Sequence, residues 1–191
     1  MQKVDLKDRF LFVKEKVNSY VLFLPPDMIA VKVFRTELVN SLREHNFPDD
    51  DVIKIELACD EALTNSITAN VANNSSETII CRWKITQKKF SLIIMDYGSG
   101  IPVDKPKEVS EAQTDSLIDK FQKRQNEPRI LPFEGKQKVH KNLGQGLKII
   151  HNLMDTVKVK YHCYDKISAE PNEEDTINGS ILEMEFQSKS R

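Results

Sequence analysis

The chain contains few of the residues that mark several large classes of protein. Its 191 residues include three cysteines, six glycines and one tryptophan. The cysteines are far apart and form no Cys-x-x-Cys pair, so we expect neither a disulfide framework nor a zinc site, but burial as small apolar side chains. No apolar run approaches the roughly 20 residues that a membrane-spanning helix needs, and the first ten residues lack a signal-peptide core. These absences favour a protein of the reducing cytoplasm.

A strong charge of either sign is also missing. The 28 Lys and Arg residues nearly balance the 29 Asp and Glu residues, which gives a formal net charge of −1. Such a chain has no overall field that favours nucleic acid or an anionic membrane. With 39% hydrophobic residues and this length, we expect one globular domain with a sizeable core.

The hydrophobic pattern predicts an α+β protein. Clustered helices and strands favour a two-layer α/β sandwich, with a mixed, mostly antiparallel sheet covered on one face by helices. Strand 90–96 is an almost continuous apolar run, which indicates a strand covered on both faces. Residues 3–17 fit either a short helix or an edge strand. The predicted elements are strand 19–24, a helix capped by Asp27, a helix capped by Asp49 or Asp50 and ending near Val71, strands 78–86 and 90–96 forming a hairpin, a helix from Gly146, and strands 155–164 and 181–186.

One predicted helix carries two polar side chains among apolar ones. Residues 56–70 read ELACDEALTNSITAN, with apolar residues on most sides, as in a buried helix. Glu61 and Asn65 stand one turn apart on one face, where each costs free energy unless it has a partner. One interpretation is an internal hydrogen-bond network. The other is a ligand site in which the Asn65 amide oxygen holds a hard cation such as Mg²⁺ and Glu61 acts as a general base.

A second motif follows the predicted buried strand. Asp96, Gly98 and Gly100 alternate with other residues where that strand ends. An ordinary turn explains this pattern. The functional alternative is that Asp96 accepts a hydrogen bond from the exocyclic amine of a purine, while the glycines let the backbone approach the base.

A third motif, Gly144-Gln145-Gly146, opens a predicted helix. Glycines and unpaired N–H groups at a helix N-terminus form a site for an anion, and Lys141 just upstream adds positive charge. As a lone feature the motif is also an ordinary helix start.

The three motifs in this order resemble the GHKL ATPase superfamily, which includes gyrase-type, Hsp90-type, histidine-kinase and MutL-type ATP-binding domains. The sequences EALTNS and NLGQGLKIIHNLMDTVKV are most similar to the small anti-sigma factor serine kinases. Asn178-Gly179-Ser180 is similar to the Gly-Ser/Thr element before the last strand of that family. The resemblance covers residues 18–187 and implies a Bergerat-type ATP-binding fold. It leaves 1–17 as an N-terminal extension, 103–142 as a long ATP lid or insertion, and 188–191 as a tail.

The resemblance implies a role for each matching residue. Asn65 would ligate Mg²⁺, Glu61 would be the catalytic base, and Asp96 would bind adenine. The other residues implied to contact the nucleotide or to shape its pocket are Gly98, Gly100, Ile101, Lys141, Gly144, Gln145, Gly146, Leu147 and Ser180.

The resemblance also implies ATP and Mg²⁺ as cofactors and proteins as partners. A member of this subfamily phosphorylates a serine of a small anti-anti-sigma factor of the STAS type and sequesters a sigma factor, typically as a cytoplasmic homodimer without contact to nucleic acid or membrane. The chain departs from the family at Ala69-Asn70, where His-Ala or His-Gly is frequent, at Gln145, and in the long charged segment 103–142. The alternative hypothesis is a nucleotide-sensing or nucleotide-free regulator that binds a partner without catalysis.

Overall fold

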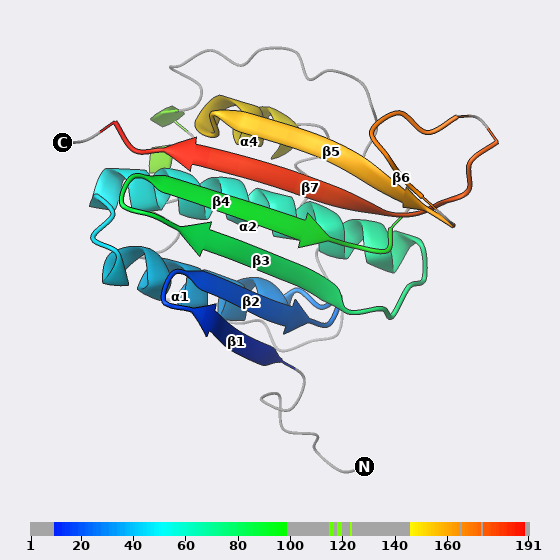
Figure 1. Cartoon of the computed structure of the whole chain (residues 1–191), viewed down its shortest axis with the longest axis horizontal. Helices are drawn as coiled ribbons and strands as arrows, with labels where there is room; N and C mark the ends of the chain where they lie inside the picture. Colours follow the sequence, from blue (N-terminus) through cyan, green and yellow to red (C-terminus); the bar gives the residue numbers. More distant parts are fainter. Residues whose placement is uncertain are drawn as a thin grey trace, which may run out of the picture.

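The described parts of the chain form one layer of helices on one sheet (Figure 1). The computed structural model describes residues 10–98, 146–164, 166–172 and 174–189, together with five helical residues, Asp115, Ser116, Ile118, Asp119 and Lys123. This architecture confirms the predicted α+β sandwich. In these ranges, no helix combines the length and the apolar character that crossing a bilayer requires.

The sheet has seven strands in the order β1-β2-β3-β4-β7-β5-β6, and every described pair is antiparallel. β7 lies between β4 and β5, so the C-terminal strand sits beside the strand that carries Asp96 (Figure 1). The strands are β1 (Leu11–Lys16), β2 (Ser19–Leu24), β3 (Ile79–Ile85), β4 (Lys89–Met95), β5 (Thr156–Cys163), β6 (Ile167–Ser168) and β7 (Ile177–Gln187).

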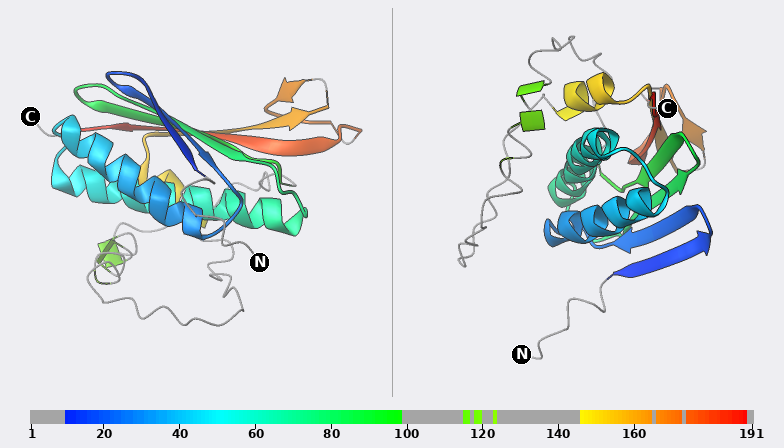
Figure 2. Two further views of the ribbon diagram at one scale, coloured as in Figure 1. Left: turned by 90° about the horizontal axis from the view of Figure 1, so that it is seen from below. Right: turned by 90° about the vertical axis from the view of Figure 1, so that its left-hand side faces the viewer.

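The helices α1 (Ile29–Glu44), α2 (Asp49–Ala72) and α4 (Gly146–Leu153) cover one face of this sheet (Figure 2). The core lies between the two layers, and the strands alternate accordingly. In β3 every second residue from Ile79 to Ile85 is buried, whereas Arg82 and Lys84 are exposed. All three cysteines are buried and free, as predicted. Burial raises the pKa of the Cys59 and Cys81 thiols, which therefore stay protonated and unreactive.

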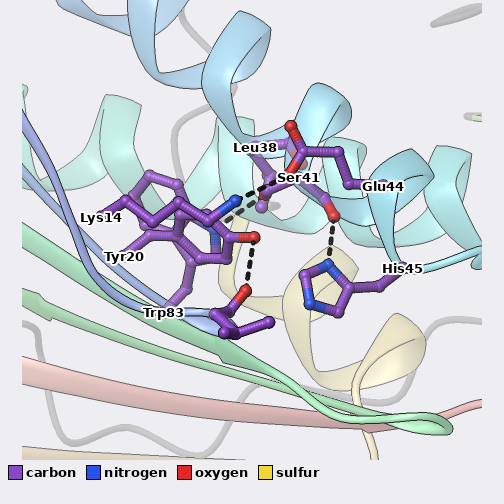
Figure 3. Close-up of polar contacts among 8 residues, drawn as sticks. Lys14, Tyr20, Leu38, Ser41, Glu44, His45 and Trp83 are labelled. Atoms are coloured by element: carbon purple, nitrogen blue, oxygen red, sulfur yellow. Dashed lines mark hydrogen bonds and ion pairs between the residues drawn. The ribbon is translucent and has the colours of Figure 1, made fainter.

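β1 resolves the ambiguity of residues 3–17 in favour of an edge strand. It pairs along β2, and Lys14 reaches across to α1, where its Nζ lies 3.1 Å from the Glu44 carboxylate. The same Nζ stands 5.4 Å above the ring of Tyr20, which stacks on Trp83 with 5.4 Å between ring centroids. Trp83 donates its Nε1–H to Ser41 of α1 at 2.9 Å (Figure 3). These contacts attach the outer strands to the helical layer.

A charged contact joins the two long helices. The Arg35 guanidinium of α1 lies 3.3 Å from Glu56 and donates a 3.1 Å hydrogen bond to Asp60, both on α2. All three side chains are largely buried, so the pairing matters more than an exposed ion pair would. It fixes α1 beside the part of α2 that carries Glu61.

The structure corrects two predicted boundaries. Neither Asp49 nor Asp50 caps α2, because Pro48 occupies that position and both acids lie in the first turn. Proline suits a helix start, and the acids complement the positive end of the helix dipole. The last strand begins at Ile177, so Asn178-Gly179-Ser180 belongs to β7 instead of preceding it.

The prediction that strand 90–96 is covered on both faces is wrong. The described helices α1, α2 and α4 all lie on one side of the sheet, and Ile93 of β4 is 39% exposed on the other. Its apolar character belongs to an outer apolar band, which crosses five strands in register on the uncovered face. The band consists of Leu11, Val13, Val21, Phe23, Ile80, Ile93, Met95 and Ile181. The continuous apolar pattern of β4 thus reflects the outer band and not a second layer of helices.

Candidate functional site

The structure places Glu61 and Asn65 of α2 against the N-terminus of α4. A Cβ atom built on Gly146, the first residue of α4, would lie 3.0 Å from Glu61 Oε2 and 3.1 Å from Asn65 Nδ2. Both side chains are partly buried, and Gly146 is buried. The first and third sequence motifs therefore meet in space, although about 80 residues separate them.

A side chain at position 146 would meet the polar ends of two side chains at 3.0 to 3.4 Å, so this position has little room beyond glycine. The first N–H groups of a helix have no partner within the helix, so α4 presents hydrogen-bond donors beside the Glu61 carboxylate and the Asn65 amide. Oxygen donors next to a helix N-terminus suit a hard cation that carries an anionic ligand. In the described ranges, this location included, no group of three His, Cys, Asp or Glu side chains has the arrangement of a metal site.

Asp96 occupies the end of β4 and is 1% exposed. Its Oδ1 accepts hydrogen bonds from the backbone N–H of Gly98 at 3.0 Å and of Ser180 at 3.2 Å. Its Oδ2 accepts the hydroxyl of Ser180 at 2.8 Å. A carboxylate oxygen accepts two hydrogen bonds, so Oδ2 keeps one lone pair in a fixed direction. This arrangement suits recognition of a single N–H donor.

His162 is a residue of this site that the sequence did not indicate. Its Nε2–H donates a 2.8 Å hydrogen bond to the backbone carbonyl of Asp96, and its ring meets that of Tyr97 edge-on at 5.0 Å. Gly179 of β7 lies beside the hydrogen bond between His162 and the Asp96 carbonyl. A Cβ atom on Gly179 would collide with both groups. The glycine before Ser180 thus lets the imidazole cross β7 and hold the end of β4.

The other residues singled out from the sequence divide into two groups. Gly98 and Leu147 are described: Gly98 packs so closely on Ala69 of α2 that a Cβ would collide with it, and Leu147 packs against the core. The remainder lie outside the described residues, as does most of the segment 103–142. They are Gly100, Ile101, Lys141, Gly144 and Gln145.

Asn70 in the last turn of α2 and Asn73 directly after it were also missed, although a signal for them exists. The two asparagines stand three residues apart and follow the Glu61-x-x-x-Asn65 motif. Asn70 belongs to the Ala69-Asn70 pair that departs from the family pattern. The sequence alone shows this departure. The structure adds that the Asn70 side chain accepts a hydrogen bond from the backbone N–H of Tyr97, the residue after Asp96.

Comparison with known proteins gives one family. The model of the histidine kinase-like ATPase domain matches residues 24–166, three quarters of the chain. No curated protein matches the sequence. Among solved structures, a chain of the SiaB–SiaC complex from Pseudomonas aeruginosa is similar with a TM-score of 0.47 and 11% sequence identity, over 97% of this chain and 99% of that one.

Proposed function

The chain belongs to the histidine kinase-like ATPase domain family, and we propose that it binds ATP with Mg²⁺ and transfers phosphate to a serine of a protein partner. The observation that carries the proposal is the meeting of Glu61, Asn65 and Gly146 on one side of the helical layer. Asp96 and Ser180 supply a second fixed recognition point at the end of β4. The nucleotide-binding domain in this proposal comprises residues 18–187.

Each residue has a distinct task in the proposed reaction. Asp96 accepts the adenine amino group through the lone pair that Ser180 leaves open. Asn65 offers its amide oxygen to Mg²⁺, which neutralises charge on the phosphates. Glu61, one turn earlier on α2, orients the incoming serine hydroxyl and takes its proton. The N-terminus of α4 donates hydrogen bonds toward the phosphates.

The finer part of the proposal concerns the partners. We propose an anti-sigma factor that phosphorylates an anti-anti-sigma protein of the STAS type and sequesters a sigma factor. Two features support it: the sequence likeness in residues 61–66 and 142–159, and the near-neutral charge. The buried, protonated cysteines are consistent with the reducing cytoplasm.

Calorimetry with ATP and ADP in the presence of Mg²⁺ separates this proposal from a nucleotide-free regulator. We expect saturable binding of both nucleotides. A pull-down from cell lysate with and without ATP, followed by mapping of phosphorylated serines on the captured protein, then identifies the acceptor. Absence of binding at millimolar nucleotide would favour the regulator that binds a partner without catalysis.

The proposal includes a homodimer, and the outer apolar band supports it. Leu11, Val13 and Ile93 of this band are exposed, and exposed apolar side chains grouped on one face are a feature of protein contacts. On this face, residues of neighbouring strands stand side by side, so that Ile93 of β4 lies between Arg82 and Glu183. Two copies could pack these faces together about a two-fold axis parallel to β4. Ile93 and Met95 would then each meet the same residue of the second copy, and Arg82 would face Glu183 of the second copy. Such a contact is isologous and closed.

The dimer proposal predicts that Ile93→Glu gives monomers. Ile93 is 39% exposed between Arg82 and Glu183 of the neighbouring strands, so a carboxylate is tolerated in the monomer but repels its own copy across the axis. Sedimentation velocity measures the change in mass. Gln187→Glu introduces the same charge at the polar end of β7 and should leave the dimer intact. An unchanged mass for the Ile93 variant would place the dimer contact elsewhere.

A further inference from the structure

Two asparagine side chains, Asn70 in the last turn of α2 and Asn73 directly after the helix, hold both polar backbone groups of Tyr97. The N–H of Tyr97 donates a 2.8 Å hydrogen bond to Asn70 Oδ1, and Asn73 Nδ2 donates a 3.2 Å hydrogen bond to the Tyr97 carbonyl. Figure 1 shows the end of β4 beside the C-terminal end of α2, where this clamp forms. Tyr97 directly follows Asp96, so the asparagine clamp acts on the residue next to the proposed adenine ligand.

Asn70 is the central member of the asparagine clamp. It is 0% exposed, and its Nδ2 donates a further 3.2 Å hydrogen bond to the carbonyl of Glu77, just before β3. One partner is a donor and the other an acceptor, so the orientation of the amide is determined. A buried amide is costly unless its hydrogen bonds are made, which gives this position little freedom to move.

Two further contacts fix the same turn. Gly98 packs on Ala69, the residue before Asn70 on α2, so closely that there is no room for a side chain at position 98. From the sheet side, His162 holds the carbonyl of Asp96 at 2.8 Å. Residues 96–98 are therefore fixed between α2 and β5, and the Asp96 carboxylate has a defined position relative to the helix.

α2 also carries Asn65 and Glu61, which face α4. Asn65 precedes Asn70 by five residues, a helix length of roughly 7.5 Å. A helix is stiff over that length, so the asparagine clamp holds Asp96 at a constant distance from Asn65 and Glu61. The spacing between the group that reads the base and the groups that meet the phosphates is thereby set by α2.

We propose that Asn70 and Asn73 are positioning residues for nucleotide selection, which hold Asp96 where it distinguishes an amino group from an oxygen at C6 of the purine. The inference rests on the proposed ATP binding. The inference gives a role to the departure from the family pattern at Ala69-Asn70, because Asn70 aligns the Asp96 carboxylate that contacts the base. Its loss weakens the preference for adenine without removing a residue that touches the nucleotide.

The experiment measures dissociation constants for ATP and for inosine triphosphate, in which an oxygen replaces the 6-amino group. We expect the unaltered protein to prefer ATP. Asn70→Ala should reduce the preference by about tenfold, since one hydrogen bond that orients the turn is worth that order of affinity. Asn70→Asp keeps the oxygen that accepts from Tyr97 but sets a carboxylate oxygen against the Glu77 carbonyl, so it should lose preference as well. Thr68→Ala, on the exposed side of the same helix, is the matched control.

The outcomes separate the two levels of the proposal. Failure of the unaltered protein to bind either nucleotide overturns the proposed function and this inference with it. Binding with a preference that survives in both Asn70→Ala and Asn73→Ala overturns the asparagine clamp alone. If Asn70→Ala does not fold, the exposed Asn73 carries the test, with a smaller loss of preference expected. In an Asp96→Asn background, Asn70→Ala should cause no further loss, because its effect passes through Asp96.

Discussion

Glu61→Ala is expected to bind ATP and to transfer no measurable phosphate. Glu61 stands one turn from Asn65 and lies against the start of α4, where the hydroxyl of an incoming serine can reach it. Removal of a general base lowers the rate of the catalysed step by roughly 10²–10⁴-fold. The base-binding end of the site, at Asp96, is built from other elements, so affinity for the nucleotide should persist. Transfer of radiolabelled γ-phosphate to the captured partner measures the rate, and calorimetry measures the affinity.

Two further variants make the result specific. Glu61→Gln keeps the size of the side chain and its hydrogen bonds but cannot take a proton, so it should be as defective as Glu61→Ala. Asp50→Asn makes the same change of carboxylate to amide on an exposed residue in the first turn of α2, and should transfer phosphate normally. Unchanged transfer in both Glu61 variants would exclude the role of base. Loss of nucleotide binding in both would show that Glu61 serves the phosphate end of the site instead.

The sequence predicted the parts of the site that depend on order along the chain. The apolar surroundings of Glu61 and Asn65 indicated a buried helix, and the glycines at 144–146 indicated the start of a helix. The structure brings Gly146 within contact distance of both side chains. Periodicity sufficed here because each motif lies inside, or at the end of, a strongly patterned element.

The sequence could not predict contacts between segments whose pairing depends on strand order. The pairing of Ser180 with Asp96 requires β7 to lie beside β4, and the reach of His162 to Asp96 requires β5 to follow on the next position. Neither neighbour relation is encoded in local propensity. The apolar run of β4 was misread for the same reason, since coverage by a helix and an apolar residue on an uncovered face produce the same pattern.

Gly146→Val is expected to abolish tight binding of ATP while the protein remains folded. The first added carbon alone would stand 3.0 Å from Glu61 Oε2 and 3.1 Å from Asn65 Nδ2, and the branched carbons of valine need more room. Overpacking of this kind costs about 1–3 kcal/mol, which corresponds to roughly ten- to a hundredfold in affinity. The displaced side chains are the ones proposed to meet Mg²⁺ and the serine hydroxyl, so the steric cost falls on the ligand site.

A graded series tests whether the defect follows from volume at this point. Gly146→Ala adds only the first carbon, which two flexible side-chain ends can accommodate by small shifts, and should lose less affinity than Gly146→Val. Thr68→Val places the same branched side chain at an exposed position of α2 with almost no change in volume, and should bind ATP as the unaltered protein does. Calorimetry gives the affinities, and circular dichroism during heating shows that each variant is folded. Equal affinity of Gly146→Val and the unaltered protein would mean that the nucleotide does not occupy the space between α2 and α4, and would remove the observation on which the proposed function depends.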